Sequence, residues 1–370
     1  MKSLFKILLG LMGLLVVVVI AVAITFATLD PNNHKDWISE KALEKTGRTL
    51  VLDGDIEVTF YPWLGLEANN ISIGNADGFG DEAFFKAEYL KVRIKLMPIF
   101  KERYEVDTVS IRGAVVNLAR NTEGVNNWDD LLESKKSDDS ATPLAAVVLG
   151  GVDVQKASVH WVDATTDTHY QIRNMNIKTD ALIYGEPLNL SVDMDAMANK
   201  PALSGKANIK GTISYDIDNQ IYNIRPLELL ATVRGENIPG GETQAKLITA
   251  IDLNLDEDTV KIDSINLQAL NTQVNGNLSA SRIQTPGPSV QASFKVEGED
   301  LAQLFKVAEI EPLASQIASL SDRSFTLDTS LDADMERGDI DLSQLLLTML
   351  GARVQGDVKA RNILSETPAY

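Results

Sequence analysis

The chain has 370 residues, of which 44% are hydrophobic and 23% are charged, and its formal net charge is −18. The hydrophobic fraction is typical of a folded protein, and the length predicts two or three structural units. The acidic charge argues against nucleic acid as a partner, because phosphate binding needs clustered Lys and Arg side chains. Cysteine is absent, which excludes disulfides, thiolate nucleophiles and cysteine-based metal sites.

The N-terminal segment predicts a membrane anchor. Residues 7–29 contain no charged side chain and are mostly apolar. In a helix, roughly 20 such residues span the ~30 Å hydrocarbon layer of a bilayer. Lys2 and Lys6 precede the segment and Asp30 follows it, so the positive-inside bias places the N-terminus in the cytoplasm. A cleaved signal peptide is the alternative, although its apolar stretch is usually only about 7–15 residues long. We therefore expect residues 1–29 to form a cytoplasmic tip and a single transmembrane helix.

Beyond the anchor, the sequence predicts a mainly β protein with a few short helices. A helix capped by Asp36 should end at Gly47. Apolar and polar residues then alternate, as in residues 91–96, where one face is apolar and the other cationic. Asp53-Gly54 fits either a hairpin turn or a bulge inside one long strand. A helical stripe from Asp300, which can cap it, to Leu320 is the main interruption of the strand pattern.

Two features divide the chain. Residues 134–143 have almost no apolar content, which predicts a flexible linker between a β-domain at 30–133 and a repeated β-region at 144–370. Within the second region, residues 273–280 resemble residues 353–360, and upstream apolar positions match without a gap at the same spacing of 80 residues. A repeated strand–turn–strand unit buries its apolar face by continuing a neighbouring sheet, which predicts an elongated architecture. Chance similarity between two amphipathic strands is the alternative.

An ordered series of short motifs resembles the N-terminal region of the AsmA family of Gram-negative envelope proteins. The series covers residues 1–133 and consists of the apolar anchor, Thr46-Gly47-Arg48, Gly54, Pro62, Leu64-Gly65, Asn75-Ala76, Gly78-Phe79, Leu96-Met97-Pro98, Gly124 and Asn127-Trp128. Beyond the linker the match is looser, although residues 159–163 resemble the first strand of the family's next section. Family members are often longer, so this chain is either a short member or lacks a C-terminal part.

The resemblance implies a single-pass inner-membrane protein with a cytoplasmic N-terminus and a periplasmic body. The family is similar in design to chorein-type bridge-like lipid-transfer proteins, in which an elongated antiparallel β-sheet curls into a groove with an apolar inner face. It implies phospholipid acyl chains, the inner membrane and envelope proteins as partners, and a role in lipid transfer or homeostasis between the two membranes. The alternative is a scaffold or regulator of outer-membrane protein assembly that binds no lipid. Few and short helices leave a long sheet uncovered, which favours lipid.

Alternation defines the residues expected to face lipid, because side chains two positions apart share a face. In the part near the anchor these are Leu66, Ile71, Ile73, Val92, Ile94, Leu96, Val109, Ile111, Val116 and Leu118. In the repeated region they are Val274, Leu278, Val354 and Val358. Lys91, Arg93 and Lys95 form either a surface that contacts anionic headgroups or an ordinary solvated strand face.

The sequence predicts no catalytic, cofactor or metal site. Three scattered histidines without cysteine argue against a metal centre. Asp252 could begin a calcium loop, but Glu257 stands where the sharp turn of such a loop needs Gly. Phosphate-binding loops, nucleophile elbows and zincin motifs are absent from the sequence. Asn127 is expected to cap a short helix whose first turn contains Asp129 and Asp130. We therefore expect a protein that is not an enzyme.

Overall fold

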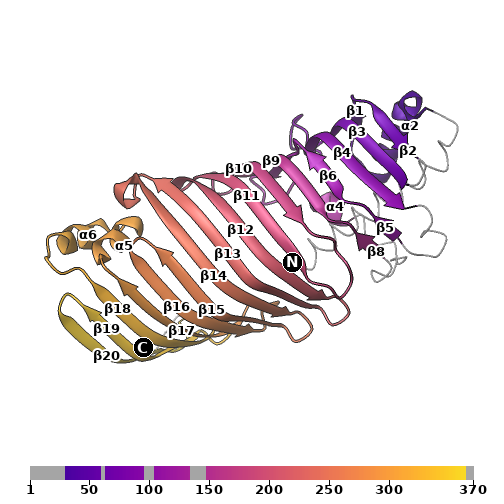
Figure 1. The fold of residues 1–370 in the computed structure, drawn as a ribbon. Coiled ribbons are helices and arrows are strands. Elements are labelled where there is room, and N and C mark those ends of the chain that lie inside the picture. The colour runs from indigo at the N-terminus through magenta and orange to yellow at the C-terminus, as the bar shows by residue number, and fades with distance from the viewer. Residues whose placement is uncertain (1–29, 60–62, 96–103, 134–146, 364–370) are drawn as a thin grey trace. The chain divides into compact units, whose positions relative to one another are not determined.

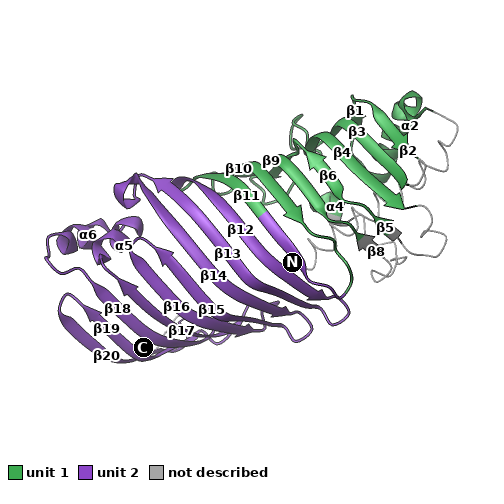
Figure 2. Ribbon diagram, viewed as in Figure 1, with its two compact units in different colours: residues 1–184, 192–201 green, residues 185–191, 202–370 purple. Residues whose placement is uncertain are grey.

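The computed structural model describes residues 30–59, 63–95, 104–133 and 147–363, and within them the protein is mainly β with a few short helices (Figure 1). The chain divides into two compact units, residues 1–184 with 192–201 and residues 185–191 with 202–370 (Figure 2). None of the described helices is long and apolar enough to cross a membrane. The predicted anchor, at residues 1–29, lies outside the described residues.

The first unit is a mixed sheet with two helices. Its elements are η1 (Pro31–His34), α2 (Lys35–Thr46), β1 (Leu50–Leu52), β2 (Ile56–Thr59), β3 (Trp63–Ile73), β4 (Phe85–Lys95), β5 (Tyr104–Val106), β6 (Val109–Arg112), β7 (Val115–Arg120), α4 (Asp129–Glu133), β8 (Val147–Leu149), β9 (Val152–Asp163) and β10 (Thr168–Thr179). β3 pairs with β1 and β2 on one side and with β4 on the other, and β4 pairs in turn with β5, β6 and β7. The boundary between the two units falls within β11 (Leu188–Asn199).

This sheet is not purely antiparallel, which corrects the expectation from the sequence. β8 runs parallel to β5, and β9 runs parallel to β6 and β7. Parallel neighbours require a long crossover connection, and α4 lies in the connection between β7 and β8. The predicted linker lies outside the described residues. The strands that follow it join the sheet that precedes it, so the division between the compact units comes later in the chain.

The start of the first unit follows local sequence signals closely. α2 ends as predicted at Gly47, whose φ of 71° is left-handed and whose N–H donates to the Leu43 carbonyl. Its beginning differs from the expectation at Asp36, because Asp30 caps the preceding turn η1. Asp53-Gly54 is not a hairpin, since β1 and β2 both pair with β3. A Cβ on Gly54 would lie 2.4 Å from the Asn69 carbonyl oxygen, so the close approach of β3 requires glycine there.

The second unit is an antiparallel meander of nine strands. Its elements are β12 (Ala202–Asp216), β13 (Ile221–Gly235), η3 (Pro239–Gly241), β14 (Glu242–Asn254), β15 (Thr259–Ala269), β16 (Thr272–Ser281), β17 (Ser289–Gly298), α5 (Leu301–Val307), α6 (Glu311–Ala318), β18 (Phe325–Asp334), β19 (Asp339–Met349) and β20 (Ala352–Ala360). Each strand pairs with the next along the chain. The predicted helical region is confirmed, because Asp300 caps α5 by accepting from the Ala302 N–H.

The internal repeat predicted from the sequence is confirmed by the strand register. Ile262 lies opposite Leu278 in the β15–β16 pair, and Leu342 lies opposite Val358 in the β19–β20 pair. Both pairs also shift register at the same relative position, because β15 and β19 each carry one extra residue there. Such a bulge bends its strand and increases the local twist. The two hairpins are therefore the same structural unit used twice.

Candidate functional site

One face of the second unit is apolar across all nine strands β12–β20, and we call it the apolar face. Strand register places directly opposite residues on the same side of a sheet. One row on this face consists of Ile209, Leu229, Leu247, Leu267, Val274, Val296, Leu327, Leu347 and Val354. A second row consists of Ile213, Ile224, Ile251, Ile262, Leu278, Ala292, Leu331, Leu342 and Val358. The four residues predicted from the repeated region all lie in these two rows.

The apolar face is only half-buried along β12–β16. Leu229, Leu247 and Leu267 are all intermediate in exposure, and none of the buried hydrophobic clusters among the described residues lies on these five strands. A protein core covered by a second layer would bury most of these side chains almost completely. In the described part of the chain, strand pairing alone therefore accounts for the partial burial of this face.

The helices α5 and α6 cover one corner of the apolar face. Leu301 and Ile317 pack with Phe325 in a buried cluster, against which Val296 and Met349 also pack. The turn between the helices reaches the β13–β14 connection, where the Asn237 side chain donates to Glu309 Oε1 at 2.8 Å. The cover thus extends along one set of strand ends and leaves the centre of the face open.

Two tyrosines lie side by side on this face, at the end of β12 and the beginning of β13. Tyr215 on β12 lies directly opposite Tyr222 on β13. Burial raises the pKa of both phenols, with smaller contributions from the nearby carboxylates of Glu186 and Asp256, respectively. Tyrosine combines an apolar ring with a polar tip, and this pair therefore suits a boundary between an apolar surface and water.

The residues predicted near the anchor do not form one open surface. Val92 and Ile94, with exposed fractions of 1% and 0%, belong to a closed core with Leu64, Val106, Val109 and Leu149. Leu66 and Ile111 pack against this core, and Ile71 lies in a second buried cluster with Ile56 and Ala68. These side chains pack against other parts of the protein. Leu96 lies outside the described residues.

Strand register and the buried clusters place the predicted residues of the first unit that the structure describes on one side of the sheet. Val116 and Ile73 both lie opposite Phe85 on β4. Ile71, two residues before Ile73, shares a buried cluster with Ala68, which lies three positions earlier, so the alternation of β3 shifts once near Asn70, whose φ is 48°. Leu118 lies on β7 two residues after Val116, and its neighbour on β9 is Trp161. The predicted residues therefore share one side of the sheet, and it is the burial of Val92, Ile94 and Ile71 on that side that differs from an open surface.

The cationic face of β4 is neutralised by acidic neighbours. Lys91 pairs with Glu67 at 2.8 Å, Lys95 pairs with Glu105 at 3.0 Å, and Arg93 pairs with Asp107. Arg93 and Lys95 also lie over the Trp63 ring, within 6 Å of its centroid. Lys91 and Tyr89 lower the pKa of the Glu67 carboxyl by hydrogen bonding to it. Headgroup binding by these cations stays a prediction, and it would have to compete with these contacts.

The first unit contains a network of buried amide side chains that the sequence did not predict. Asn127 has an exposed fraction of 0%, and its side chain donates to Asn75 Oδ1 and to the Asn117 carbonyl, both at 2.8 Å. Its Oδ1 accepts from the Ala119 N–H, so Asn127 does not act as the helix cap expected from the sequence. α4 begins instead at Asp129, whose carboxylate accepts from the Asn126 N–H.

Arg48 joins this network from the end of α2. It is 2% exposed, and its guanidinium binds Asp130 through Nε at 3.0 Å and through Nη2 at 2.6 Å. Nη2 also donates to the Asn127 carbonyl at 2.6 Å, and the guanidinium lies over the Phe84 ring, 4.5 Å from its centroid. Arg48, Asn75 and Asn127 all belong to the motifs that carried the family resemblance. Those motifs therefore mark a structural network that joins α2 to α4.

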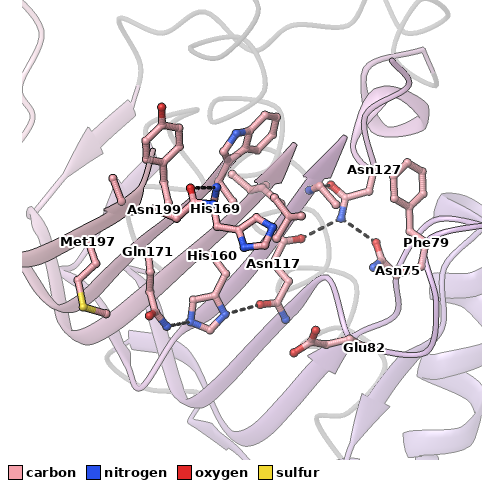
Figure 3. Close-up of a pocket in the computed structure, with 16 residues that line it drawn as sticks. Asn75, Phe79, Glu82, Asn117, Asn127, His160, His169, Gln171, Met197 and Asn199 are labelled. Carbon is pink, nitrogen blue, oxygen red and sulfur yellow. Dashed lines mark hydrogen bonds between the residues drawn. The ribbon is translucent and has the colours of Figure 1, made fainter. Parts of the chain in front are cut away.

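A pocket of about 480 Å³ opens beside this network in the first unit (Figure 3). A chain of hydrogen bonds crosses its wall, in which Gln171 contacts His160 Nε2 at 2.8 Å and His160 Nδ1 contacts Asn117 Oδ1 at 2.9 Å. The amide oxygen can only accept, so Nδ1 carries the proton and Nε2 accepts from Gln171. Asn117 in turn donates to the Ala83 carbonyl at 2.8 Å. These groups satisfy one another, which indicates a structural rather than a ligand-binding role.

No group of three or more His, Asp or Glu side chains within the described ranges could hold a metal ion. The pocket and the apolar face differ in the chemistry of the surface that they expose. The pocket mixes apolar side chains with polar groups that pair with one another, whereas the apolar face is continuous across nine strands and largely half-exposed. Of the two, the apolar face is the stronger candidate for a functional site.

Comparison with known proteins points to one family. The model of the AsmA family matches residues 1–360. Protein AsmA of Escherichia coli (strain K12) is 28% identical over 119 residues, which are 32% of this chain and 19% of that protein. The aligned part thus spans about a fifth of the relative's length. No solved structure matches the chain. Because the family model covers nearly the whole sequence, the chain belongs to the AsmA family.

Proposed function

We propose that this protein handles lipids in the cell envelope by holding acyl chains along the apolar face of its second unit. The observation that carries the proposal is the continuity of two apolar rows across nine strands whose side chains stay half-exposed. Exposed apolar patches on soluble monomers are seldom larger than a few hundred Å² unless they bind something. Each lipid methylene buried on such a face contributes about 0.8 kcal/mol.

The residues of the apolar face suit acyl chains better than a shaped small molecule. Leu, Ile and Val dominate both rows, and the polar residues of the same strands lie on the other side of the sheet, as Lys210 and Glu228 do. A smooth aliphatic surface gives little directional hydrogen bonding, so it favours long, flexible apolar chains over one specific compound. We infer no catalytic step, because the two rows consist of aliphatic side chains and contain no reactive group.

Family membership supports a place in the envelope for this activity. We propose that residues 7–29 anchor the chain in the inner membrane, that its N-terminus is cytoplasmic and that the body lies in the periplasm. Phospholipids moving between the inner and outer membranes are the proposed cargo. The closed core of the first unit, around Ile94, is then a structural base near the anchor and takes no part in binding.

A photo-crosslinking experiment tests the proposal directly. A photo-reactive amino acid is placed at Leu267, on the apolar face, and in a matched control at the adjacent Gln268, on the opposite side of β15. After irradiation in cells, lipid attached to the purified protein is measured by mass spectrometry. We expect phospholipid at position 267 and at least about tenfold less at position 268, because only one side of the strand is apolar.

A second variant separates lipid binding from folding. Leu247→Asp places a charge in the middle of the face and should abolish the crosslink at position 267 while the protein still folds. Equal crosslinking at positions 267 and 268, or none at 267 in the folded wild-type protein, would contradict the proposal. The latter result would favour a scaffold that binds no lipid.

A further inference from the structure

Among the described strands of the second unit, β13, β15 and β19 each carry one residue more than the strands beside them. In β13, Arg225 and Pro226 together lie opposite the single residue Ala250 of β14. In β15 the extra residue is Asp263, and in β19 it is Gln344. Each of these irregularities is a β-bulge, in which two residues of one strand oppose one residue of the partner.

The three bulges lie in one line that crosses the strands. Strand register connects them through a third row of the apolar face, which lies between the two apolar rows and which we call the central row. Each bulge directly precedes the residue that its own strand contributes to this row, so the bulges bend the sheet along one common line. The central row consists of Gly211, Leu227, Thr249, Ile265, Gly276, Phe294 and Thr329, and in the last hairpin of Leu345 and Gly356.

The extra residues lie on the polar side of the sheet. In β15, Asp263 and Ser264 are both exposed, whereas Ile262 and Ile265 on either side of them belong to the apolar face. The bulge residues of β13 are exposed in the same way, and so is Gln344 in β19. One extra residue lengthens the polar side of a strand by about 3.3 Å. A strand that is longer on one side bends toward the other, so the bulges make the apolar face concave.

Burial agrees with a concave face. Thr249 and Thr329 lie in the central row, and their exposed fractions are only 5% and 8%. Leu247 and Ile251, on either side of Thr249 along β14, are intermediate in exposure. Side chains at the bottom of a trough are enclosed by neighbours from both directions, whereas side chains on its walls remain accessible. The central row therefore has the burial expected of the bottom of a trough.

The two threonines also satisfy a polar group beside each of two bulges. A bulge disrupts the hydrogen-bond ladder of its strand locally. The Thr249 hydroxyl donates to the Ser264 carbonyl at 2.6 Å, and the Thr329 hydroxyl donates to the Ser343 carbonyl at 3.3 Å. The threonines are 80 residues apart, so the internal repeat uses the same contact twice. Because both carbonyls are paired, an apolar chain lying on the central row would not desolvate an unsatisfied group there.

We propose that the three bulges are positioning elements of the lipid site, which bend the apolar face into a trough along the central row. An acyl chain lying in this trough contacts the central row beneath it and one apolar row on each side. A flat sheet would offer the same chain fewer contacts, and each methylene buried adds to binding. This inference rests on the proposed function and deepens it, because it assigns the shape of the site to the bulges at Arg225–Pro226, Asp263 and Gln344.

The first measurement follows the shape of the face in the full-length protein. Deletion of Asp263 restores one-to-one pairing in β15 and leaves the other residues of the strand on their own sides. The sequence contains no cysteine, so spin labels can be attached specifically through Ala245→Cys and Leu253→Cys, on the apolar side toward the two ends of β14. We expect the deletion to lengthen the distance between the labels by roughly 3 Å, the rise of one residue.

Asp263→Asn is the matched control for this deletion. It keeps the bulge and removes the charge that pairs with Arg225 and Lys261. The distance between the labels should therefore stay at the wild-type value. A change of distance in the control as large as that in the deletion would mean that the ion pairs, and not the extra residue, bend the strand, and would overturn the inference.

The second measurement is the yield of crosslinked phospholipid, with the photo-reactive amino acid at Leu247 on β14, beside the altered strand. Deletion of Asp263 should lower the yield about tenfold, the effect of losing contact with about two methylenes. Asp263→Asn should stay within about twofold of wild type. Deletion of Gln344 is a second, independent variant, and it should cause the same loss at Leu327 on β18. Thermal unfolding identifies the variants that fold.

Lipid yield and label distance together decide the inference. A folded deletion variant that keeps the wild-type yield would overturn it, whether or not the label distance changes, because the bulges would then serve the fold alone. A lower yield without a longer distance would overturn it as well. Absence of lipid from the wild-type protein would overturn the proposed function and with it the role of the bulges in binding. The label distance would still show whether the bulges bend the sheet.

Discussion

The two compact units share the same alternating strand pattern, but the pattern has a different result in each. In the first unit, alternating strands bury Val92 and Ile94 in a closed core with Leu149 from β8. In the second unit, alternating strands form a face on which Leu247 and Leu267 stay half-exposed. The difference arises because the crossover of the first unit returns β8 and β9 to the same sheet, whereas the second unit is a simple meander.

An apolar strand face can therefore be covered either by protein or by a ligand. Alternation shows that one side of a strand avoids water, but it does not show whether protein or a ligand covers that side. In the first unit the cover is protein, and the residues there serve stability. Among the described residues of the second unit, a cover is present only at the corner formed by α5 and α6. The following predictions test this difference between the two units.

The largest difference should come from a charge placed on each face. Ile94→Asp buries an unpaired carboxylate and should lower the free energy of unfolding by about 4 kcal/mol or more. Leu247→Asp, on the half-exposed face, should cost no more than about 2 kcal/mol, because water can still reach the new carboxylate. Urea unfolding of both variants measures the two values. Similar losses would mean that the apolar face is a covered core.

The second largest effect on stability should come from removing the buried guanidinium of Arg48. Arg48→Met deprives Asp130 and the Asn127 carbonyl of their donor and should destabilise the first unit by about 2–4 kcal/mol. Arg234→Met is a suitable control, because the ion pair of Arg234 with Glu242 is exposed and should contribute less than about 1 kcal/mol. Urea unfolding with a probe in each unit gives the comparison. An Arg48 variant as stable as the control would remove the structural role of this network.

Lipid should stabilise the second unit selectively. If acyl chains bind the apolar face, a lipid concentration of about 100 times Kd stabilises the bound unit by about 2.7 kcal/mol. Hydrogen exchange should then slow in β13–β16 while the strands β3 and β4 keep their rates. Slower exchange in both units to the same extent would point to a general detergent-like effect rather than to a binding face.

The smallest effect should be a dependence on pH in the first unit. Lys91, followed by Tyr89, lowers the folded-state pKa of Glu67. A lowered pKa contributes stability that is fully present above the unfolded-state value of about 4.3 and is lost as pH falls through the folded-state value. Glu67→Gln should therefore reduce stability by less than about 1 kcal/mol at pH 7, and the difference should disappear in acid. Denaturation at several pH values checks this, with Glu57→Gln on β2 as the control. A loss that persists unchanged in acid would show that the carboxylate charge is not responsible.

Much of the local structure was predictable from the sequence because its causes lie within a few residues. Gly47 ended α2, Asp300 capped α5, and the 80-residue repeat fixed the common register of β15–β16 and β19–β20. Val274, Leu278, Val354 and Val358 reached the same face because a meander without crossovers carries alternation from strand to strand unchanged. At these positions the local sequence pattern and the tertiary structure favour the same conformation.

The tertiary structure alone decided what covers each face and what pairs with each charge. Ile94 was expected on an open surface and is enclosed, because β8, much later in the chain, returns beside β5 and adds Leu149 to the core around Ile94. Asn127 was expected to cap a helix, and instead it connects β7 to Asn75 across 52 residues of sequence. The cations of β4 were expected to face either headgroups or water, and each has an acidic neighbour. Alternation is a local property of one strand, whereas covering and charge pairing depend on residues that only the fold brings together.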